Sequence, residues 1–293
     1  MKNFAGNTVV ITGAGSGFGR EFARKSAALG MNLVLADVQK DALMAVADEL
    51  LPLVKAKGAG VIANVVDVSK GAQVDALAID AKKAFGNVHL LFNNAGVAAG
   101  GLIWESTEAD WQWVMGVNVW GVIHGIRAFV PDMLAHGQAG HVVNTASVAG
   151  LLSAPTMGVY NVSKHAVVTM SETLYNDFRM VNAKLSASVL CPAFVPTGIH
   201  ESHRNRPEDL AAGEATASQI ASQKASTKAV TSGKVTATQV CEMTFNAIEQ
   251  EHFYIVTHEK IMKSVQLRLD DVSGQRNPTD PFTYKPDVAY AAK

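Results

Sequence analysis

The sequence predicts an α/β fold in which helices cover both faces of a parallel sheet. Seven short apolar segments alternate with six helical patterns along the 293 residues. Such alternation is typical of βαβ units, which build parallel sheets. A glycine-rich turn joins the first strand to the first helix, and several polar motifs directly follow strands. These observations together predict a ligand site beyond the carboxyl ends of the strands.

The elements are placed in order from the N-terminus. The β-branched run TVVI at 8–11 predicts a short buried strand, REFARKSAALG is a helix pattern ended by Gly30, and MNLVLAD predicts the second strand. Strands are expected at residues 8–12, 31–36, 60–66, 88–93, 140–146, 185–191 and 253–257. Helices are expected at residues 17–29, 39–57, 70–85, 108–136, 155–180 and 235–250.

The turn TGAGSGFG at 12–19 lies between the first strand and the first helix. In this context backbone N–H groups and the helix N-terminus can face a phosphate. The common dinucleotide fingerprint is absent, because the sixth position counted from Gly13 is Phe18. A flexible turn between two core elements is the alternative, and the strand-to-helix context favours the phosphate site.

Asp37 closes the second apolar run, eighteen residues beyond Gly19. An acid there can accept hydrogen bonds from an adenosine ribose, and it repels a 2′-phosphate by roughly 4 kcal/mol at about 4 Å and an effective dielectric near 20. Neither Ser16 nor Val38 provides a compensating cation. The pattern therefore favours NAD over NADP, although an exposed acid ending a strand is the alternative.

Tyr160 and Lys164 stand four residues apart, and Tyr160 follows Ser147 by thirteen residues. On a helix this spacing places the phenol and the ammonium on one face. Lowering a phenol pKa from about 10 to the neutral range takes roughly 4 kcal/mol, which one cation at about 4 Å can supply. The pair is interpreted as a proton-transfer device, with the Ser147 hydroxyl holding a substrate oxygen.

Six motifs together resemble the short-chain dehydrogenase/reductase family, in its single-domain subgroup. They are TGAGSGFG at 12–19, NVVDVS at 64–69, NNAG at 93–96, Asn118 in GVNVWG, Ser147 in NTASVAG, and Tyr160 with Lys164 in YNVSK. They occur in the family's order and spacing from about residue 5 to residue 200. The resemblance implies a Rossmann-type doubly wound parallel sheet of about seven strands, in three α/β/α layers, with strand order 3-2-1-4-5-6-7.

The resemblance also implies a set of cofactor-binding residues. They are Gly13, Ser16, Phe18, Gly19, Asp37, Asp67, Val68, Asn94, Ala95, Gly96, Tyr160, Lys164, Pro192, Val195 and Thr197. By resemblance, the first glycine turn would line the pyrophosphate, Asp37 the ribose, Asp67 and Val68 the adenine, and residues 94–96 the back of the cofactor. The family's usual Pro-Gly-aromatic sequence reads PAFVPT at 192–197, where an alanine replaces the glycine. Thr197 would still bond the carboxamide.

The catalytic residues implied by the resemblance are Asn118, Ser147, Tyr160 and Lys164. Tyr160 would be the general acid/base and Ser147 would position the substrate oxygen. Lys164 would lower the tyrosine pKa and bind the nicotinamide ribose, while Asn118 would hold a water that relays protons.

Two regions depart from the regular alternation. Residues 198–234 are rich in Ala, Ser, Thr, Lys and Gln, and they are expected to form a loop and helix that cover bound substrate, with a mobile surface connection as the alternative. Residues 1–260 are expected to form one catalytic domain. The tail at 261–293 is expected to be disordered or packed on a neighbouring subunit.

The substrate pocket is expected, by family position, to be apolar. Its expected walls are the covering segment at 198–234 together with Ala98, Gly100, Val148, Leu151, Leu152, Met157 and Phe194. This set favours a neutral, hydrophobic or aromatic alcohol or ketone, and plain core packing is the alternative for each residue. Trp104, Trp111 and Trp113 are interpreted as packing residues.

Composition limits the remaining function classes. The net charge of −1 gives no indication of binding to nucleic acid or to an anionic membrane. Two cysteines are too few for a disulfide framework, and no cluster has metal-ligand spacing. No signal-peptide pattern or membrane-spanning apolar stretch is found, so a cytoplasmic location is expected. Family resemblance implies a homodimer or homotetramer.

The sequence therefore predicts reversible hydride transfer between a secondary alcohol and a ketone, with NAD as cofactor and a small molecule as substrate. Two alternatives remain. One is an NADP-dependent carbonyl reductase, and the other is a non-catalytic nucleotide-sensing protein on the same fold.

Overall fold

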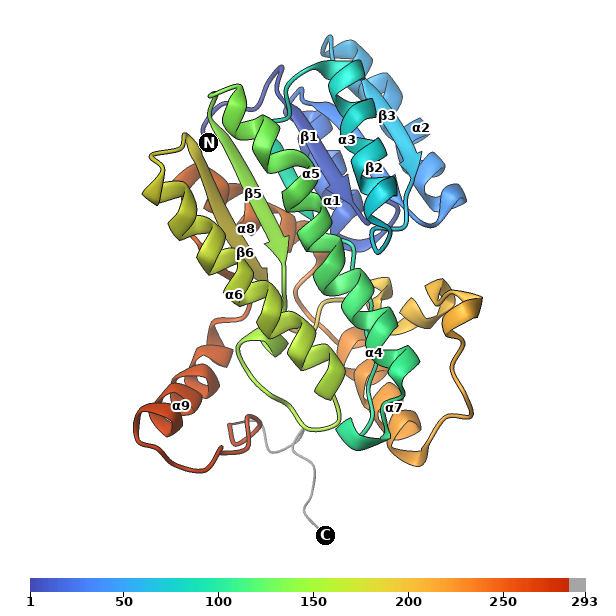
Figure 1. Cartoon of the computed structure of the whole chain (residues 1–293), viewed down its shortest axis with the longest axis vertical. Helices are drawn as coiled ribbons and strands as arrows, with labels where there is room; N and C mark the ends of the chain where they lie inside the picture. Colours follow the sequence, from blue (N-terminus) through green and yellow to red (C-terminus); the bar gives the residue numbers. More distant parts are fainter. Residues whose placement is uncertain (285–293) are drawn as a thin grey trace.

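The computed structural model describes residues 1–284 and contains one seven-stranded parallel sheet (Figure 1). The strands are β1 (Thr8–Thr12), β2 (Asn32–Asp37), β3 (Val61–Val65), β4 (Leu90–Asn93), β5 (Gly140–Thr145), β6 (Leu185–Cys191) and β7 (Tyr254–Val256). Their order is β3-β2-β1-β4-β5-β6-β7, and every neighbouring pair is parallel. The predicted fold class and strand order are confirmed.

Helices cover both faces of the sheet (Figure 1). One layer consists of α1 (Gly17–Ala28), α2 (Lys40–Ala56) and α8 (Ala237–Gln250). The other consists of α3 (Gly71–Phe85), α5 (Gly121–Ala135) and α6 (Gly158–Met180). The strand order reverses direction beside β1, between β1 and β4, where such sheets bind ligands.

Two hydrophobic clusters fill the space between the sheet and its helices. Because successive strand residues point to opposite faces, Ile11 belongs to one cluster and its neighbour Val10 to the other. Phe22 of α1 stacks on Phe92 in the first cluster, with ring centroids 4.3 Å apart. The sheet is therefore buried on both faces, which explains the nearly continuous apolar strands.

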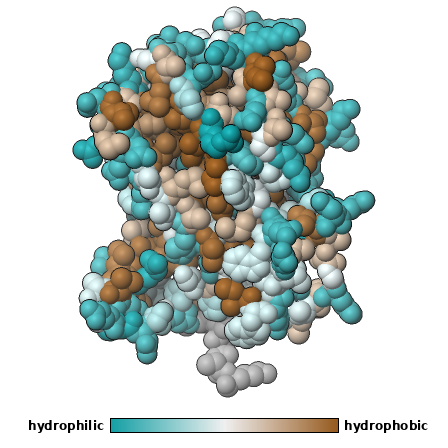
Figure 2. All heavy atoms as spheres, in the orientation of Figure 1, coloured by the Kyte–Doolittle hydropathy of each residue, from teal (hydrophilic) through white to brown (hydrophobic). Residues whose placement is uncertain are grey.

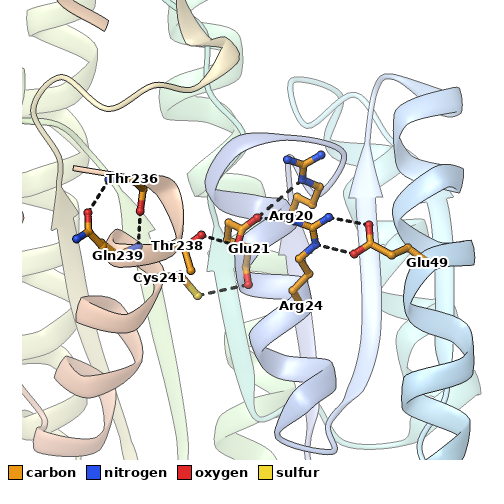
Figure 3. A network of polar contacts seen from close by, with 8 residues as sticks. All are labelled: Arg20, Glu21, Arg24, Glu49, Thr236, Thr238, Gln239 and Cys241. Atoms are coloured by element: carbon orange, nitrogen blue, oxygen red, sulfur yellow. Dashed lines mark hydrogen bonds and ion pairs between the residues drawn. The ribbon is translucent and has the colours of Figure 1, made fainter. Parts of the chain in front are cut away.

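Polar contacts fix α1 against its two neighbours in the first layer (Figure 3). Arg24 donates two hydrogen bonds to the Glu49 carboxylate of α2, at 2.6 and 2.9 Å. On the other side, Thr238 and Cys241 of α8 donate to the side chain and the carbonyl of Glu21. These contacts hold the helix whose N-terminus follows the glycine turn.

The predicted helix at 108–136 is divided by a turn of π-helix. The structure has α4 (Glu108–Met115), the π-helix η2 (Gly116–Trp120) and α5 in succession. By length and composition alone, the run Glu108–Ala135 could cross a membrane, but 56% of its most apolar window is buried inside this fold. Such burial is typical of a core helix, and α5 packs on α3 and β4.

The region after β6 is more ordered than a loop with one helix. It forms the 3₁₀ helices η4 (Gly198–Asn205) and η5 (Glu208–Leu210), followed by α7 (Ala217–Thr231). Other short 3₁₀ helices are η1 (Ile103–Glu105), η3 (Val148–Gly150) and η6 (Glu259–Ile261).

The predicted tail begins with a helix that the sequence reasoning did not identify. This helix, α9 (Met262–Ser273), packs Ile261 and Val265 against Leu152. The prediction for the tail also falls on residues 285–293, which lie outside the described residues.

Candidate active site

A cavity of about 350 Å³ opens at the carboxyl ends of β1, β2, β4, β5 and β6. It brings together most of the predicted site residues. Those that line it are Gly13, Ser16, Phe18, Asp37, Asp67, Val68, Asn94, Ala95, Gly96, Ser147, Tyr160, Lys164, Pro192, Val195 and Thr197. Gly19 and Asn118 are the two predicted residues that do not line it.

The glycine turn forms a cradle that packs too closely on its neighbours to accept side chains at Gly13 and Gly19. Gly13 has a φ of +67°, and a Cβ there would lie 2.9 Å from the Cα of Ala95. A Cβ at Gly19 would lie 2.0 Å from the carbonyl oxygen of Gly13. Gly19 therefore acts through close packing of α1 under the turn, which explains why it does not reach the cavity.

Thr12 joins the ends of β1 and β4 beneath this turn. Its hydroxyl accepts hydrogen bonds from the backbone N–H groups of Asn94 and Ala95, at 2.9 and 3.1 Å, and donates to the carbonyl of Phe92. The Asn94 side chain donates to the carbonyl of Thr12 at 2.9 Å. The NNAG segment is thereby held against the cradle.

Two carboxylates mark the side of the cavity beyond β2 and β3. The oxygens of Asp37 accept from the backbone N–H groups of Gly15 and Gln39, at 2.8 and 2.9 Å. Asp67 accepts from both the backbone and the hydroxyl of Ser69. Each carboxylate oxygen has further lone pairs, so Asp37 can still accept from a ribose hydroxyl.

Ser147, Tyr160 and Lys164 converge on the opposite side of the cavity. Tyr160 and Lys164 lie one turn apart on α6, with the Lys164 Nζ 5.6 Å from the centre of the Tyr160 ring. The buried Lys164 donates to the carbonyl of Thr145 at 3.0 Å. Ser147 follows β5 and hydrogen bonds with Tyr160. The predicted serine–tyrosine–lysine juxtaposition is present.

Burial shifts the proton affinities of both groups on α6. Loss of solvent raises the pKa of Tyr160 to about 12, although the hydrogen bond with Ser147 lowers it in part. The same loss of solvent lowers the pKa of Lys164 to about 8. The protein's own groups therefore keep the phenol protonated at neutral pH, and the ammonium alone does not reverse the effect of burial.

Asn118 lies in the middle of the π-helix, behind the cavity wall. Its amide accepts from the N–H of Val97 at 2.8 Å and donates to the Val97 carbonyl at 2.9 Å and to the Ser163 hydroxyl at 3.0 Å. Ser163 in turn donates to the carbonyl of Tyr160. The asparagine thus connects the segment after β4 to the first turn of α6. Single π turns inside α-helices frequently occur at functional sites.

The segment 198–234 lines this cavity through residues such as Ile199, Leu210 and Val230, but the other predicted walls of the substrate pocket do not. Val148, Leu151 and Leu152 instead pack with Ile261 and Val265, because the unpredicted α9 covers them. Ala98, Gly100, Met157 and Phe194 are also absent from the lining. The apolar walls are Val97, Trp113, Val117, Ile199, Leu210 and Val230. Trp113 is both a packing residue, as interpreted, and a wall of the cavity.

Eight polar residues of the cavity were missed by sequence reasoning. They are Gln39, Ser69, Lys70, Gln112, Thr145, Ser202, Arg204 and Asn205. The signal available for Gln39 was its position two residues after Asp37, and for Arg204 and Asn205 their position in the segment expected to cover substrate. Among the residues described by the structure, no group of three or more His, Cys, Asp or Glu could hold a metal.

Comparison with known proteins shows which family this chain resembles. A family model described as short chain dehydrogenase matches residues 7–208. A solved short-chain dehydrogenase/reductase from Burkholderia phymatum, in complex with NAD, is 57% identical; the match covers 96% of this chain and 99% of that chain, with a TM-score of 0.92.

Two curated relatives are similar over most of their length. The CLA biosynthesis dehydrogenase/reductase of Lactiplantibacillus plantarum is 33% identical over 273 residues, which are 92% of this chain and 94% of the relative. The 1-deoxy-11-beta-hydroxypentalenate dehydrogenase of Streptomyces avermitilis is 30% identical over 267 residues, which are 90% of this chain and 88% of the relative.

Proposed function

This chain belongs to the short-chain dehydrogenase family and is an oxidoreductase, and we propose that it catalyses NAD-dependent, reversible hydride transfer between a secondary alcohol and a ketone. The observation that carries the proposal is one shared cavity. A serine–tyrosine–lysine group on one side faces a glycine cradle and Asp37 on the other. Proton-transfer residues and a dinucleotide site within one cavity support hydride chemistry rather than nucleotide sensing alone.

The residues of the cavity fit a bound NAD. The turn at Gly13 packs too closely on Ala95 for a side chain, and the N-terminus of the twelve-residue α1 follows it, as a diphosphate requires. Asp37 supports the ribose hydroxyls and opposes a 2′-phosphate. The related enzyme with bound NAD supports the same choice. NAD, when bound, supplies the hydride acceptor for an alcohol.

In the proposed mechanism Tyr160 accepts the hydroxyl proton of the alcohol during oxidation and returns it to the oxygen of the ketone during reduction. Ser147 holds the substrate oxygen and stabilises the charge that develops on it, as a preorganised donor does. Lys164, charged below its pKa of about 8, favours the ionised phenol and contacts the nicotinamide ribose. Since burial raises the pKa of Tyr160 to about 12, alcohol oxidation also depends on the cationic cofactor to favour phenolate.

The substrate in this proposal is hydrophobic or aromatic. Trp113, Val117 and Leu210 form an apolar wall in the same cavity as Tyr160. Residues 198–234 act as the cover over that substrate, and residues 1–260, which contain all seven strands, act as one catalytic domain.

The direct test is NADH formation with a panel of secondary alcohols. We expect an increase in absorbance with hydrophobic or aromatic alcohols and NAD, and a lower kcat/KM with NADP. A preference for NADP would contradict the cofactor assignment. Binding of NADH without turnover on any alcohol or ketone would favour the nucleotide-sensing alternative.

We also propose a homodimer or homotetramer in the cytoplasm. Figure 2 shows hydrophobic side chains in the middle of the face formed by α3, α5 and α6. Ile79, Trp120 and Val162 are large exposed hydrophobic residues on α3, the π-helix and α6. Exposed apolar patches of this kind often mark subunit contacts, and light scattering measures the assembly.

A further inference from the structure

The 3₁₀ helix η4 lies across the rim of the sheet. It begins directly after Thr197, beyond the end of β6, and its last residue, Asn205, contacts Gln39, beyond the end of β2. Three strands, β5, β4 and β1, separate β6 from β2. Four inter-strand spacings amount to about 19 Å, and eight 3₁₀ residues to about 16 Å. We call Gly198–Asn205 the strap, because the helix covers most of this distance and the side chains of Asn205 and Gln39 complete the connection.

The strap is attached to several sides of the cavity. Ser202 accepts a hydrogen bond from the N–H of Ala98 at 2.9 Å, and Gln223 of α7 donates to the carbonyl of His200 at 2.6 Å. Immediately after the strap, the partly buried Arg206 forms an ion pair with the buried Asp110 at 2.6 Å. These contacts hold the strap beside α4 and α7, on the substrate side.

The attachment on the β2 side is a hydrogen bond between two neutral side chains. The Gln39 Nε2 donates to the Asn205 Oδ1 at 2.7 Å, and both residues are only partly buried. A hydrogen bond between two neutral amides contributes less to stability than one involving charged groups. The Gln39–Asn205 bond therefore breaks more readily than the Asp110–Arg206 ion pair, which anchors the chain one residue further on.

The Gln39–Asn205 pair lies beside the proposed cofactor site. Gln39 and Asn205 line the same cavity as Asp37 and Gly13. The backbone N–H of Gln39 donates to the Asp37 carboxylate at 2.9 Å, so the residue proposed to hold the ribose also orients Gln39. Closing this pair encloses a dinucleotide beneath the strap, and its opening exposes the adenosine side.

We propose that Gln39 and Asn205 form a clasp over the bound dinucleotide and that opening of this clasp sets the rate of cofactor release. The inference rests on the proposed function, because it requires NAD(H) in the cavity. Gln39 and Asn205 are positioning residues for the cofactor, and neither takes part in proton transfer.

The test is a double-mutant cycle read by the release of NADH. Gln39→Ala, Asn205→Ala and the double variant are compared in stopped-flow experiments, in which excess NAD displaces NADH and fluorescence reports the loss. Each single variant is expected to release NADH about threefold to tenfold faster, the range expected for a lost neutral hydrogen bond. The double variant is expected to be no faster than the singles, because the second change removes nothing further.

A second amide pair provides a matched control. Gln250 donates to Asn246 at 2.9 Å on the exposed side of α8, away from the cavity lining. Gln250→Ala removes the same kind of bond, and NADH release is expected to stay within twofold of wild type.

The outcomes separate the clasp from the proposed function. Wild-type protein that does not bind NADH would overturn both. Normal NADH binding with unchanged release rates in the single variants, or with effects that multiply in the double variant, would overturn the clasp alone. The clasp is supported if the variants raise KM for NAD but leave the rate of the Tyr160-dependent step, measured in a single turnover, unchanged.

Discussion

At the scale of single residues, Tyr160 depends on opposing influences. Burial raises its pKa to about 12, whereas the Ser147 hydrogen bond and the proposed cofactor charge favour the phenolate. A residue in this balance is suited to giving a proton to a ketone and to taking one from an alcohol only when the cofactor is bound. Its chemistry is thereby coupled to cofactor occupancy.

The first prediction removes the phenol oxygen. Tyr160→Phe is expected to lower turnover about a hundred- to ten-thousandfold, the usual contribution of a general acid/base, while NADH still binds. Steady-state kinetics and NADH fluorescence measure the two effects separately. Turnover close to that of wild type would contradict the role given to Tyr160.

His141 leads to a prediction about acid stability. This residue of β5 is fully buried, and burial lowers the pKa of its imidazole to about 3. Ser188 donates to the carbonyl of His252 and so accepts from the His141 Nε2. Nδ1 then has no hydrogen-bond partner among residues 1–284. A neutral histidine therefore fits this site, and a protonated one does not.

The direction in which stability changes with pH follows from the difference in the pKa of His141 between the folded and unfolded chains. The unfolded chain takes up the proton near pH 6.5, whereas the folded chain stays neutral until about pH 3. Stability is therefore lost as pH falls through this window, by roughly 1.4 kcal/mol per pH unit. His141→Gln is expected to reduce the slope by that amount. Urea unfolding of both proteins at pH 8, 6 and 5 measures it, and parallel slopes would contradict the prediction.

Local spacing explains which residues of the site could be predicted. Ser147, Tyr160 and Lys164 belong to short motifs whose neighbours in sequence are also neighbours in space. The Gln39–Asn205 bond joins residues 166 positions apart, so neither residue carries a local signal. The effect of burial on Tyr160 was not predicted either, because desolvation depends on the whole of its surroundings.

At the scale of elements, α7 is attached to η1 through its first turn. Glu105 of η1 accepts hydrogen bonds from Thr216 and Ser218, at 2.6 and 2.5 Å, and these bonds lower its pKa. Ser222, one turn further, donates to the carbonyl of Thr156 at 3.1 Å. The carboxylate of Glu105 therefore holds the first turn of α7, which belongs to the proposed substrate cover.

The third prediction loosens this docking. Glu105→Ala removes the acceptor for Thr216 and Ser218, so α7 is expected to open more often, KM for the alcohol is expected to rise several-fold, and trypsin is expected to cut faster at Lys224. Glu108→Ala is the matched control, since Glu108 accepts only from Gln112 within α4 among the contacts described. Equal proteolysis of the two variants would contradict the role of Glu105.

Elements were predictable where periodicity was strong. The seven strands are apolar runs, and their parallel order followed from alternation and resemblance. The π turn at Gly116–Trp120 interrupts a pattern that is helical throughout, so no change in periodicity marks it. The helix α9 has a polar composition and buries only one side, and it displaced the expected substrate walls by covering Leu152.

At the scale of the whole molecule, cofactor binding links the two halves of the sheet. Asp37 and the cradle lie on the side of β1 and β2, whereas Ser147 and Tyr160 come from β5 and α6. A ligand that contacts both sides binds only the folded state, so it stabilises the fold by mass action. Thermal stability therefore measures binding without requiring turnover or a known substrate.

The fourth prediction uses this linkage to test cofactor choice. NAD at a hundred times its Kd is expected to stabilise the protein by about 2.7 kcal/mol, which corresponds to a rise in Tm of roughly 5 °C for a chain of this size. NADP at the same concentration is expected to raise Tm much less, because Asp37 repels the 2′-phosphate. Asp37→Ser removes the repulsion and also a ribose acceptor, so the NADP shift should grow while the NAD shift falls. Equal rises in Tm with NAD and NADP in the wild-type protein would contradict the role of Asp37. If Tyr160→Phe shows the same equal rises, both cofactors bind the site, and the preference for NAD is the part of the proposal that is wrong.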